Sequence, residues 1–213
     1  QTEKANLLIL YGRRRVGKPR LLTYWLKRHR GNGLYWVAEP TSAFDQLRSF
    51  SQAIYNFSAL EGVPPAPQDF SYANWDQALQ HVAAISRSRR LVLFIDEFTY
   101  MMDAQPGISG TLQKVWDHAL KDSNIFLVLS GSQMGLMQRQ ILAYDAPLYG
   151  RSTAQLKLQP LPYGVTQEYF PNHDPIDRVS FYAVWGGVPA YWERIDTGVS
   201  VLQSIQNQLL TAN

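Results

Sequence analysis

A glycine-rich segment, GRRRVGK from Gly12 to Lys18, follows a short apolar run and precedes a stretch with helical spacing of apolar residues. The apolar run, residues 7–11, has the length of a buried strand, and residues 20–29 carry leucines and a tryptophan at helical intervals. The spacing fits G-x-x-x-x-G-K, in which the glycines let backbone N–H groups wrap a phosphate and the lysine reaches the β- and γ-phosphates. The amino terminus of the helix adds a favourable dipole. The segment therefore predicts a strand, a phosphate-binding loop and a helix, and a solvated basic turn is the alternative. The residues expected to contact the nucleotide are Gly12, Arg15, Val16, Gly17, Lys18, Pro19 and Arg20.

The residue after this motif departs from the usual pattern. Most such loops continue with a serine or threonine whose hydroxyl ligates Mg²⁺, whereas this chain has Pro19. Proline is tolerated in the first turn of a helix, so the fold is preserved, but the metal ligand and one backbone donor to phosphate are lost. A hydrogen bond to a charged group contributes about 1.5–3 kcal/mol, so we expect nucleotide affinity to fall by about one to two orders of magnitude. Thr23 lies about 6 Å further along the helix axis and is a poor substitute for the missing hydroxyl.

Beyond the loop, apolar runs of strand length keep alternating with segments of helical periodicity. Such alternation implies right-handed crossovers and a parallel sheet that is covered on both faces and binds ligands at the carboxyl ends of its strands. After Pro160 no further strand is evident. We therefore expect an α/β, three-layer P-loop core with a parallel five-stranded sheet over residues 1–160, and a small helical lid over residues 161–213. The expected strands are residues 7–11, 34–38, 91–95, 125–129 and 155–158; the expected helices are 20–29, 44–60, 75–86, 112–120, 163–170, 177–185 and 199–210, with a turn at 31–33.

Two acidic residues end the most apolar of these strands. The run LVLFIDEF places Asp96 and Glu97 at the edge of the sheet where a parallel arrangement presents its ligand site. Asp96 would hold the Mg²⁺ shell, usually through water, and Glu97 would polarise the water that attacks the γ-phosphate in line. The alternative is that the two acids only start a loop.

Small polar residues follow the next strand in the same way. Ser130-Gly131-Ser132 could place a hydroxyl beside the γ-phosphate, because the carboxyl ends of neighbouring parallel strands meet at one edge. An ordinary turn built from small residues is the alternative.

The composition excludes several classes of protein. The chain has no cysteine, which removes disulfides, thiolate metal sites and cysteine catalysis and suits a reducing compartment, so we expect a cytoplasmic protein. No apolar run reaches the roughly 18 residues that a membrane helix needs, and we expect no membrane partner. Twenty Lys and Arg against seventeen Asp and Glu give a net charge of +3. Much of the excess lies in clusters at residues 13–15, 27–30 and 87–90. Cations at the carboxyl ends of helices interact favourably with the helix dipole, which accounts for the second and third clusters without a ligand. A nucleic-acid footprint is the alternative.

Five segments occur in a characteristic order: GRRRVGK, LFIDEF, LVLSGSQMGLM, LYGRSTAQLKLQPL and WGGVPAYW. With these the chain resembles the archaeal-type ATPases, a prokaryotic branch of the AAA+/STAND P-loop NTPases, over nearly its whole length. The most diagnostic parts are the triple-arginine loop, the Gly131-Ser132 pair and the Leu148-Tyr149-Gly150-Arg151 box.

The resemblance implies an additional-strand sheet, in which residues 125–129 lie between the loop strand and the acidic strand, and a helical lid. It also implies that Ser132 or Ser130 acts as the first sensor and that Arg151 approaches the nucleotide or a neighbouring subunit; an ordinary salt bridge is the alternative for Arg151. Relatives often carry a glycine-arginine-glutamate box upstream and winged-helix and nuclease-like regions downstream, which this sequence lacks. We therefore expect the effector region to lie outside this chain.

The motifs favour an ATP-binding ATPase domain of the AAA+/STAND kind, with Walker A and Walker B boxes, whose nucleotide state repositions the lid and an effector. ATP or ADP and Mg²⁺ are the expected ligands. Because Pro19 removes the metal ligand, a regulatory or scaffolding module that binds nucleotide without hydrolysing it is the rival hypothesis. A small-molecule kinase fits less well, because adjacent Asp96 and Glu97 suit water activation. A homo-oligomer, and DNA reached through regions outside this chain, stay open as partners.

Overall fold

The structure is a computed structural model that describes residues 4–28, 33–59 and 61–210. The chain divides into two compact units. The first comprises Gln1–Gly12 and Lys18–Lys157, and the second comprises Arg13–Gly17 and Leu158–Asn213. Part of the expected turn at 31–33, and the last residues of the helices expected at 20–29 and 44–60, lie outside the described residues.

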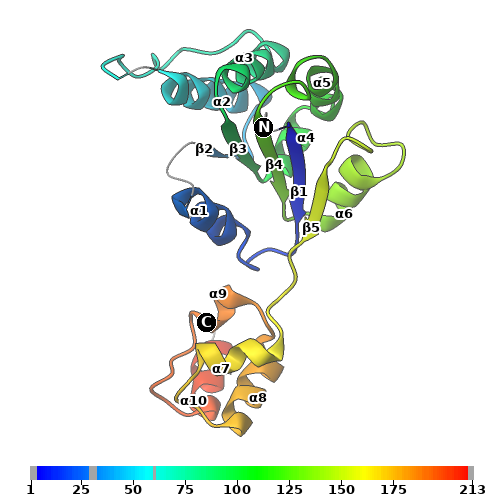
Figure 1. Ribbon diagram of the computed structural model, residues 1–213. Coiled ribbons are helices and arrows are strands. Elements are labelled where there is room, and N and C mark those ends of the chain that lie inside the picture. The colour runs from blue at the N-terminus through cyan, green and yellow to red at the C-terminus, as the bar shows by residue number, and fades with distance from the viewer. Residues whose placement is uncertain (1–3, 29–32, 60, 211–213) are drawn as a thin grey trace. The chain divides into compact units, whose positions relative to one another are not determined.

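The first unit is built on a five-stranded sheet in which all neighbouring strands are parallel (Figure 1). Its order is β2-β3-β4-β1-β5. The strand after the acidic pair therefore lies between the loop strand and the acidic strand, which confirms the expected additional-strand arrangement. The strands are β1 (Asn6–Tyr11), β2 (Gly33–Val37), β3 (Leu91–Asp96), β4 (Ile125–Gly131) and β5 (Ala154–Lys157).

Helices connect these strands, and polar caps fix where two of them begin. The Ser42 side chain accepts a hydrogen bond from the Asp45 amide, and the Asn74 side chain accepts one from the Gln77 amide, which satisfies amino-terminal donors of the two helices. Three short helical segments of this unit, α4, α6 and η2, fall where the sequence predicts none. The helical segments are α1 (Lys18–Arg28), α2 (Ala43–Ser58), α3 (Trp75–Ser88), α4 (Phe98–Ala104), α5 (Ile108–Val115), η1 (Trp116–Leu120), α6 (Met134–Met137) and η2 (Gln138–Leu142).

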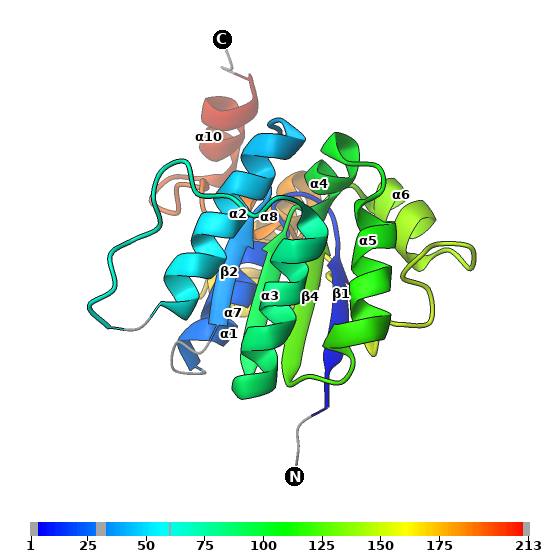
Figure 2. The same cartoon turned by 90° about the horizontal axis from the view of Figure 1, so that it is seen from above.

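Helices cover both faces of the sheet. Successive side chains of a strand point to opposite faces, so the apolar strands need a helical layer on each side. β3 is buried at every position. Leu93 and Ile95 belong to the core that includes side chains of α2, α3 and α5, which cover one face in Figure 2. Phe94 points to the other face, where its ring lies 5.6 Å from that of Trp25 on α1. The three-layer α/β fold is thus confirmed. Helix α1, which packs on this second face, begins at Lys18, the last residue of the glycine-rich segment.

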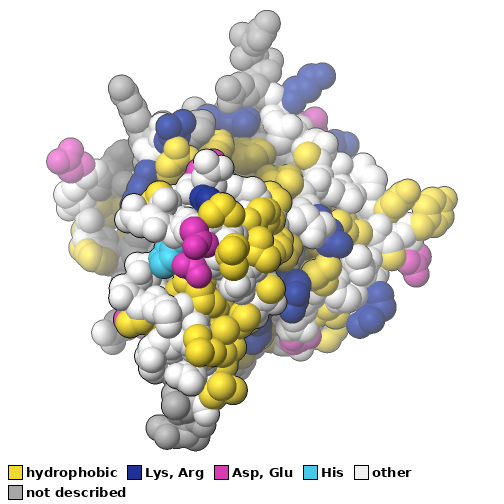
Figure 3. Space-filling view, turned by 90° about the horizontal axis from the view of Figure 1, so that it is seen from below, with side chains coloured by type: hydrophobic (Ala, Val, Ile, Leu, Met, Phe, Trp, Pro, Cys, Tyr) yellow, Lys and Arg dark blue, Asp and Glu magenta, His cyan; other side chains and the backbone are white. Residues whose placement is uncertain are grey.

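The second unit is helical and has its own aromatic core. Phe170, Phe181 and Trp192 are almost fully buried and pack against one another. Gly187 is essential to this packing, because a Cβ at this position would overlap the carbonyl oxygen of Leu161. Hydrophobic side chains also reach the surface of this unit and gather on the face in Figure 3. The segments are η3 (Tyr163–Val165), α7 (Thr166–Tyr169), α8 (Pro175–Trp185), α9 (Pro189–Trp192), α10 (Val201–Ile205) and η4 (Gln206–Leu210).

Candidate functional site

The glycine-rich loop turns sharply after β1. Its backbone is left-handed at Arg15 and Gly17, where φ is 67° and 100°. Glycine adopts such angles at no steric cost, whereas a residue with a side chain loses about 1–2 kcal/mol. Left-handed residues within a turn aim successive backbone N–H groups at a common point, which is how backbone nests bind anions. The loop therefore has backbone geometry suited to holding a phosphate.

Lys18 begins α1 and is only 3% exposed. Its Nζ donates a hydrogen bond to the carbonyl oxygen of Gly12 at 3.0 Å, so the ammonium group lies at the end of β1. Lysine is rarely buried without partners, and burial at this point marks the side chain as part of a built site. Of the other predicted loop contacts, Val16 is buried, whereas Pro19 and Arg20 are exposed.

Pro19 leaves a gap in the donors of this loop that the Thr23 hydroxyl does not fill. Proline has no backbone N–H and no hydroxyl. The Thr23 hydroxyl donates to the carbonyl oxygens of Pro19 at 2.8 Å and Arg20 at 3.2 Å, so it is engaged within α1. The structure therefore agrees with the expectation that Thr23 does not replace the missing group.

Asp96 ends β3 and is 2% exposed. Its Oδ1 accepts a hydrogen bond from the backbone N–H of Glu97 at 2.9 Å, and its Oδ2 accepts one from the Tyr35 hydroxyl at 2.5 Å. Burial raises the pKa of the Tyr35 hydroxyl, and the hydrogen bond to Asp96 and the charges of Asp96 and Glu97 raise it further. Tyr35 is therefore a protonated donor throughout the physiological range.

Glu97 leaves the strand in a left-handed conformation, with φ of 51°. Its Oε2 accepts hydrogen bonds from Ser132, at 2.8 Å from the hydroxyl and 3.3 Å from the backbone N–H. The structure thus brings together the acid predicted to polarise water and the serine predicted to act as a sensor. A non-glycine residue at positive φ is uncommon and is concentrated at functional sites.

Ser130, the other serine left open by the sequence, lies two residues before Ser132 on β4. It pairs with Leu10 of β1, and it follows directly after Leu129, which pairs with Ile95 of β3. Its Oγ is buried and has no hydrogen-bond partner among the described residues. The register places Ser130 beside Asp96, so both serines of the pair lie at the carboxyl edge of the sheet.

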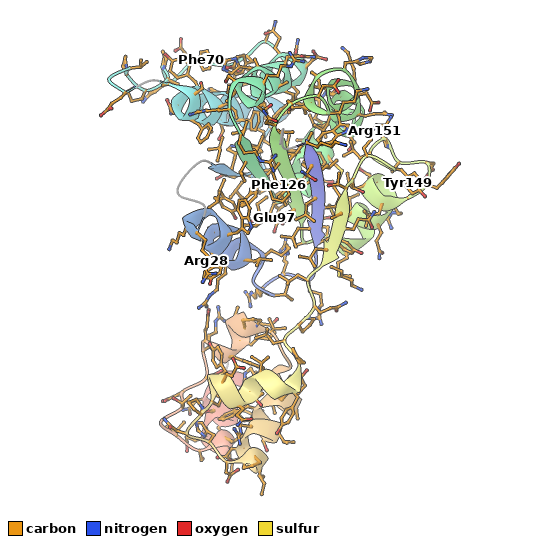
Figure 4. All side chains as sticks on the ribbon, in the orientation of Figure 1. Arg28, Phe70, Glu97, Phe126, Tyr149 and Arg151 are labelled. Atoms are coloured by element: carbon orange, nitrogen blue, oxygen red, sulfur yellow. The ribbon has the colours of Figure 1, made fainter. Side chains whose placement is uncertain are left out.

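Arg151 lies away from these groups. It precedes β5, hence at the amino ends of the strands, and Figure 4 shows Arg151 and Glu97 toward opposite ends of the sheet. Its guanidinium donates to both carboxylate oxygens of Asp117, at 2.7–3.1 Å, and to the carbonyl oxygens of Pro147 and Tyr149. Within one chain the structure does not bring Arg151 to the predicted catalytic group; it shows the salt bridge that the sequence left as the alternative.

The donor set suits a Mg²⁺ ion held largely by water and phosphate. Among the residues that the structure describes, no cluster of three or more His, Cys, Asp or Glu side chains is present. Mg²⁺ usually keeps several waters and is bound by one or two carboxylates together with substrate phosphates. Asp96, which is buried and hydrogen-bonded on both oxygens, fits the role of that carboxylate.

Tyr35 is the site residue that sequence reasoning missed. It lies in the middle of a predicted strand, where an aromatic residue indicates only packing. Its link to Asp96 depends on β2 lying next to β3, and the order of these strands becomes visible only in the folded sheet.

Comparisons with known proteins find similar sequences and similar folds. An uncharacterized protein of Methanocaldococcus jannaschii is 28% identical over 190 residues, which are 89% of this chain and 39% of that protein. The chain therefore spans less than half the length of this curated relative. Three solved structures of similar fold are each longer than this chain and are 12–18% identical to it.

These three structures illustrate the fold. A Walker-type ATPase of Pyrococcus abyssi matches 94% of this chain and 67% of its own with a TM-score of 0.66 at 18% identity. The ORC2 protein of Aeropyrum pernix in its ADP form matches 99% of this chain and 65% of its own, with a TM-score of 0.56 at 15% identity. The ORC1 protein of the same organism in complex with DNA covers 95% of this chain and 59% of its own, with a TM-score of 0.54 at 12% identity.

A family model decides the assignment. The model described as an ATPase domain predominantly from Archaea matches residues 1–195, more than nine-tenths of the chain. The G-x-x-x-x-G-K segment between strand β1 and helix α1 is in the setting of a phosphate-binding loop, which agrees with an ATPase-type, nucleotide-binding domain. The chain belongs to the family of ATPase domains found predominantly in Archaea.

Proposed function

We propose that this domain binds ATP at the loop from Gly12 to Lys18 and hydrolyses it with Mg²⁺. The observation that carries the proposal is that the ends of three adjacent strands converge. Lys18 lies at the end of β1, Asp96 ends β3 and Glu97 follows it, and Ser132 follows β4, which lies between β1 and β3. A phosphate-binding lysine, a metal-binding carboxylate and a base for water are the groups that phosphoryl transfer to water needs.

Each side chain has a distinct role in the proposed reaction. Lys18 and the loop amides bind the phosphates, and Asp96 accepts hydrogen bonds from water around Mg²⁺, which neutralises phosphate charge when bound. Glu97 orients a water and accepts its proton as the water oxygen bonds to the γ-phosphorus and the bond to the leaving β-phosphate oxygen breaks. Ser132, which now donates to Glu97, fixes the direction of that carboxylate and would report the state of the γ-phosphate.

The nucleotide state would be coupled to movement of the helical lid and of an attached effector. The division of the chain into a sheet unit and a separate helical unit with its own core supports this part of the proposal. A unit with its own core can move as a body without unfolding, because its packing does not depend on the sheet.

Binding without turnover is the second candidate function, and a specific observation favours it. Pro19 removes a hydroxyl and a backbone donor, and the nearest hydroxyl along the helix, that of Thr23, is engaged with backbone carbonyls. In this case the domain is a nucleotide-dependent regulatory or scaffolding module.

Nucleotide binding and phosphate release, each with Mg²⁺ and with EDTA, separate the candidates. The parent, Lys18→Ala and Glu97→Gln are compared. Turnover that Glu97→Gln abolishes while binding persists supports the ATPase. Binding without turnover in the parent supports the module, and absence of any binding that depends on Lys18 refutes both.

We also propose a homo-oligomer and DNA as partners, the latter through regions outside this chain, and a cytoplasmic location. The ORC1 structure with DNA supports the DNA proposal by likeness of fold. No helix among the described residues has the length and apolar character to cross a membrane. Gel filtration with and without ATP tests the oligomer, and absence of any shift in elution volume with ATP counts against a nucleotide-driven assembly.

A further inference from the structure

A tyrosine on the edge strand contacts the carboxylate that the proposed function assigns to the metal. In the parallel register of β2 and β3, Tyr35 pairs with Phe94 and Val37 pairs with Asp96. Side chains two residues apart on a strand share a face, so Tyr35 and Asp96 point to the same side of the sheet. The Tyr35 hydroxyl donates to Asp96 Oδ2 at 2.5 Å.

This hydrogen bond fixes the direction of the Asp96 carboxylate. At 2% exposure the carboxylate is largely removed from bulk water, and a buried charge must be held by hydrogen bonds. The Glu97 backbone N–H holds Oδ1 and the Tyr35 hydroxyl holds Oδ2, so both oxygens are positioned from the protein side. A carboxylate has about four acceptor sites, which leaves room on each oxygen for a further donor.

The Tyr35 hydroxyl is of interest because the glycine-rich loop lacks a hydroxyl of its own at position 19. In loops of this kind a serine or threonine at position 19 would bring a hydroxyl to the Mg²⁺ side of the phosphates, and Pro19 brings none. The Thr23 hydroxyl is engaged within α1. The hydroxyl that donates to the Asp96 carboxylate comes from the neighbouring strand β2.

We propose that Tyr35 is a positioning residue that orders the Asp96 carboxylate for the Mg²⁺–nucleotide complex in a loop that has lost its own hydroxyl. The inference rests on the proposed role of Asp96 toward Mg²⁺. Tyr35 acts through Asp96 and does not itself contact the nucleotide or the metal. Its removal lowers the gain in nucleotide affinity that Mg²⁺ provides, and leaves metal-free binding by the loop unchanged.

The test is the ratio of the nucleotide dissociation constant in EDTA to that in Mg²⁺, measured by titration with a fluorescent ATP analogue. Tyr35→Phe removes only the hydroxyl and is expected to lower this ratio about tenfold, the effect of one hydrogen bond to a charged group. Its affinity in EDTA stays within twofold of the parent. Tyr182→Phe is the matched control, because it removes a hydroxyl that donates to the Leu161 carbonyl in the helical unit, and it leaves the ratio unchanged.

A rescue experiment distinguishes positioning from simple support of the fold. In the Tyr35→Phe background, Pro19→Thr returns a hydroxyl to the Mg²⁺ side and raises the ratio about tenfold, whereas in the parent it raises the ratio about threefold or less. This coupling is what a double-mutant cycle measures. Equal effects of Pro19→Thr in the two backgrounds overturn the inference. If Tyr35→Phe does not fold, the test is the effect of Pro19→Thr in the parent alone. A rise of the ratio by tenfold or more in the parent then overturns the inference.

Asp96→Asn separates this inference from the function on which it rests. When Mg²⁺ strengthens binding in the parent and Asp96→Asn abolishes that gain, an unchanged ratio in Tyr35→Phe overturns the inference alone. When Mg²⁺ has no effect on the parent, the metal role of Asp96 and the role of Tyr35 are both overturned.

Discussion

Replacing Pro19 tests how much this loop has lost. Position 19 is the second residue of α1 and is exposed, so the substitution changes no core packing. Alanine restores the backbone N–H alone, whereas threonine restores the N–H and a hydroxyl. One hydrogen bond to a charged group contributes about 1.5–3 kcal/mol, which corresponds to at least about tenfold in affinity.

Pro19→Ala and Pro19→Thr are therefore expected to bind ATP about tenfold more tightly than the parent in EDTA. With Mg²⁺ only Pro19→Thr gains further, by about threefold, because only threonine carries a hydroxyl that can ligate the metal. The two variants and the parent are compared by titration with a fluorescent ATP analogue. If the affinities of all three agree within twofold in EDTA, the backbone of the loop does not hold the phosphates as we reason.

Three further outcomes follow from the structure. Glu97→Gln keeps ATP binding within threefold and lowers phosphate release at least a hundredfold, the lower range for loss of a general base; phosphate release at the parent rate in this variant contradicts the assignment. Arg151→Ala leaves ATP affinity within twofold but lowers the free energy of unfolding by about 1 kcal/mol at neutral pH, a figure discounted because the pair is partly exposed. The hydrogen bond from Arg151 lowers the pKa of the Asp117 carboxyl, so the stabilisation by this pair is complete above the ordinary pKa of an aspartate and disappears as pH falls through the lowered pKa. Chemical unfolding of the parent and of Arg151→Ala at neutral pH and at about pH 3 checks the sign. If Arg151→Ala loses more unfolding free energy at the acidic pH than at neutral pH, the reasoning is refuted. Gly187→Ala unfolds the helical unit because its Cβ would overlap the Leu161 carbonyl, and aromatic circular dichroism that matches the parent would rule out this contact.

The sequence predicts the fold well because its strongest signals are local. Continuous apolar runs such as residues 91–95 indicate strands buried on both faces, and the structure has them as strands with one or two more residues. The strand order follows from resemblance, since no local pattern specifies which parallel strands are neighbours. The short helix α4 is not predicted, because its seven residues make fewer than two full turns and start directly after Glu97.

The sequence names most residues of the candidate site but not their contacts; it also names Arg151, which pairs with Asp117 elsewhere, and it misses Tyr35. Gly12, Lys18 and Asp96 are recognised because their spacing and their place after strands follow from the chemistry of phosphate binding. Glu97 and Ser132, which are hydrogen-bonded, lie 35 residues apart in the sequence, and Tyr35 and Asp96 lie 61 residues apart. Such pairs depend on register and on side-chain direction across neighbouring strands, which a single sequence does not display.

Nucleotide binding by Lys18→Ala tests the central claim most directly. The Lys18 side chain is buried at the end of β1. Lys18→Ala removes its ammonium group and changes no residue of the sheet. The account predicts that ATP affinity, measured by isothermal titration in Mg²⁺, falls at least tenfold while the melting temperature of the free protein stays within a few degrees of the parent. ATP binding of equal affinity in the parent and in Lys18→Ala, with both proteins folded, would contradict a phosphate site at this loop.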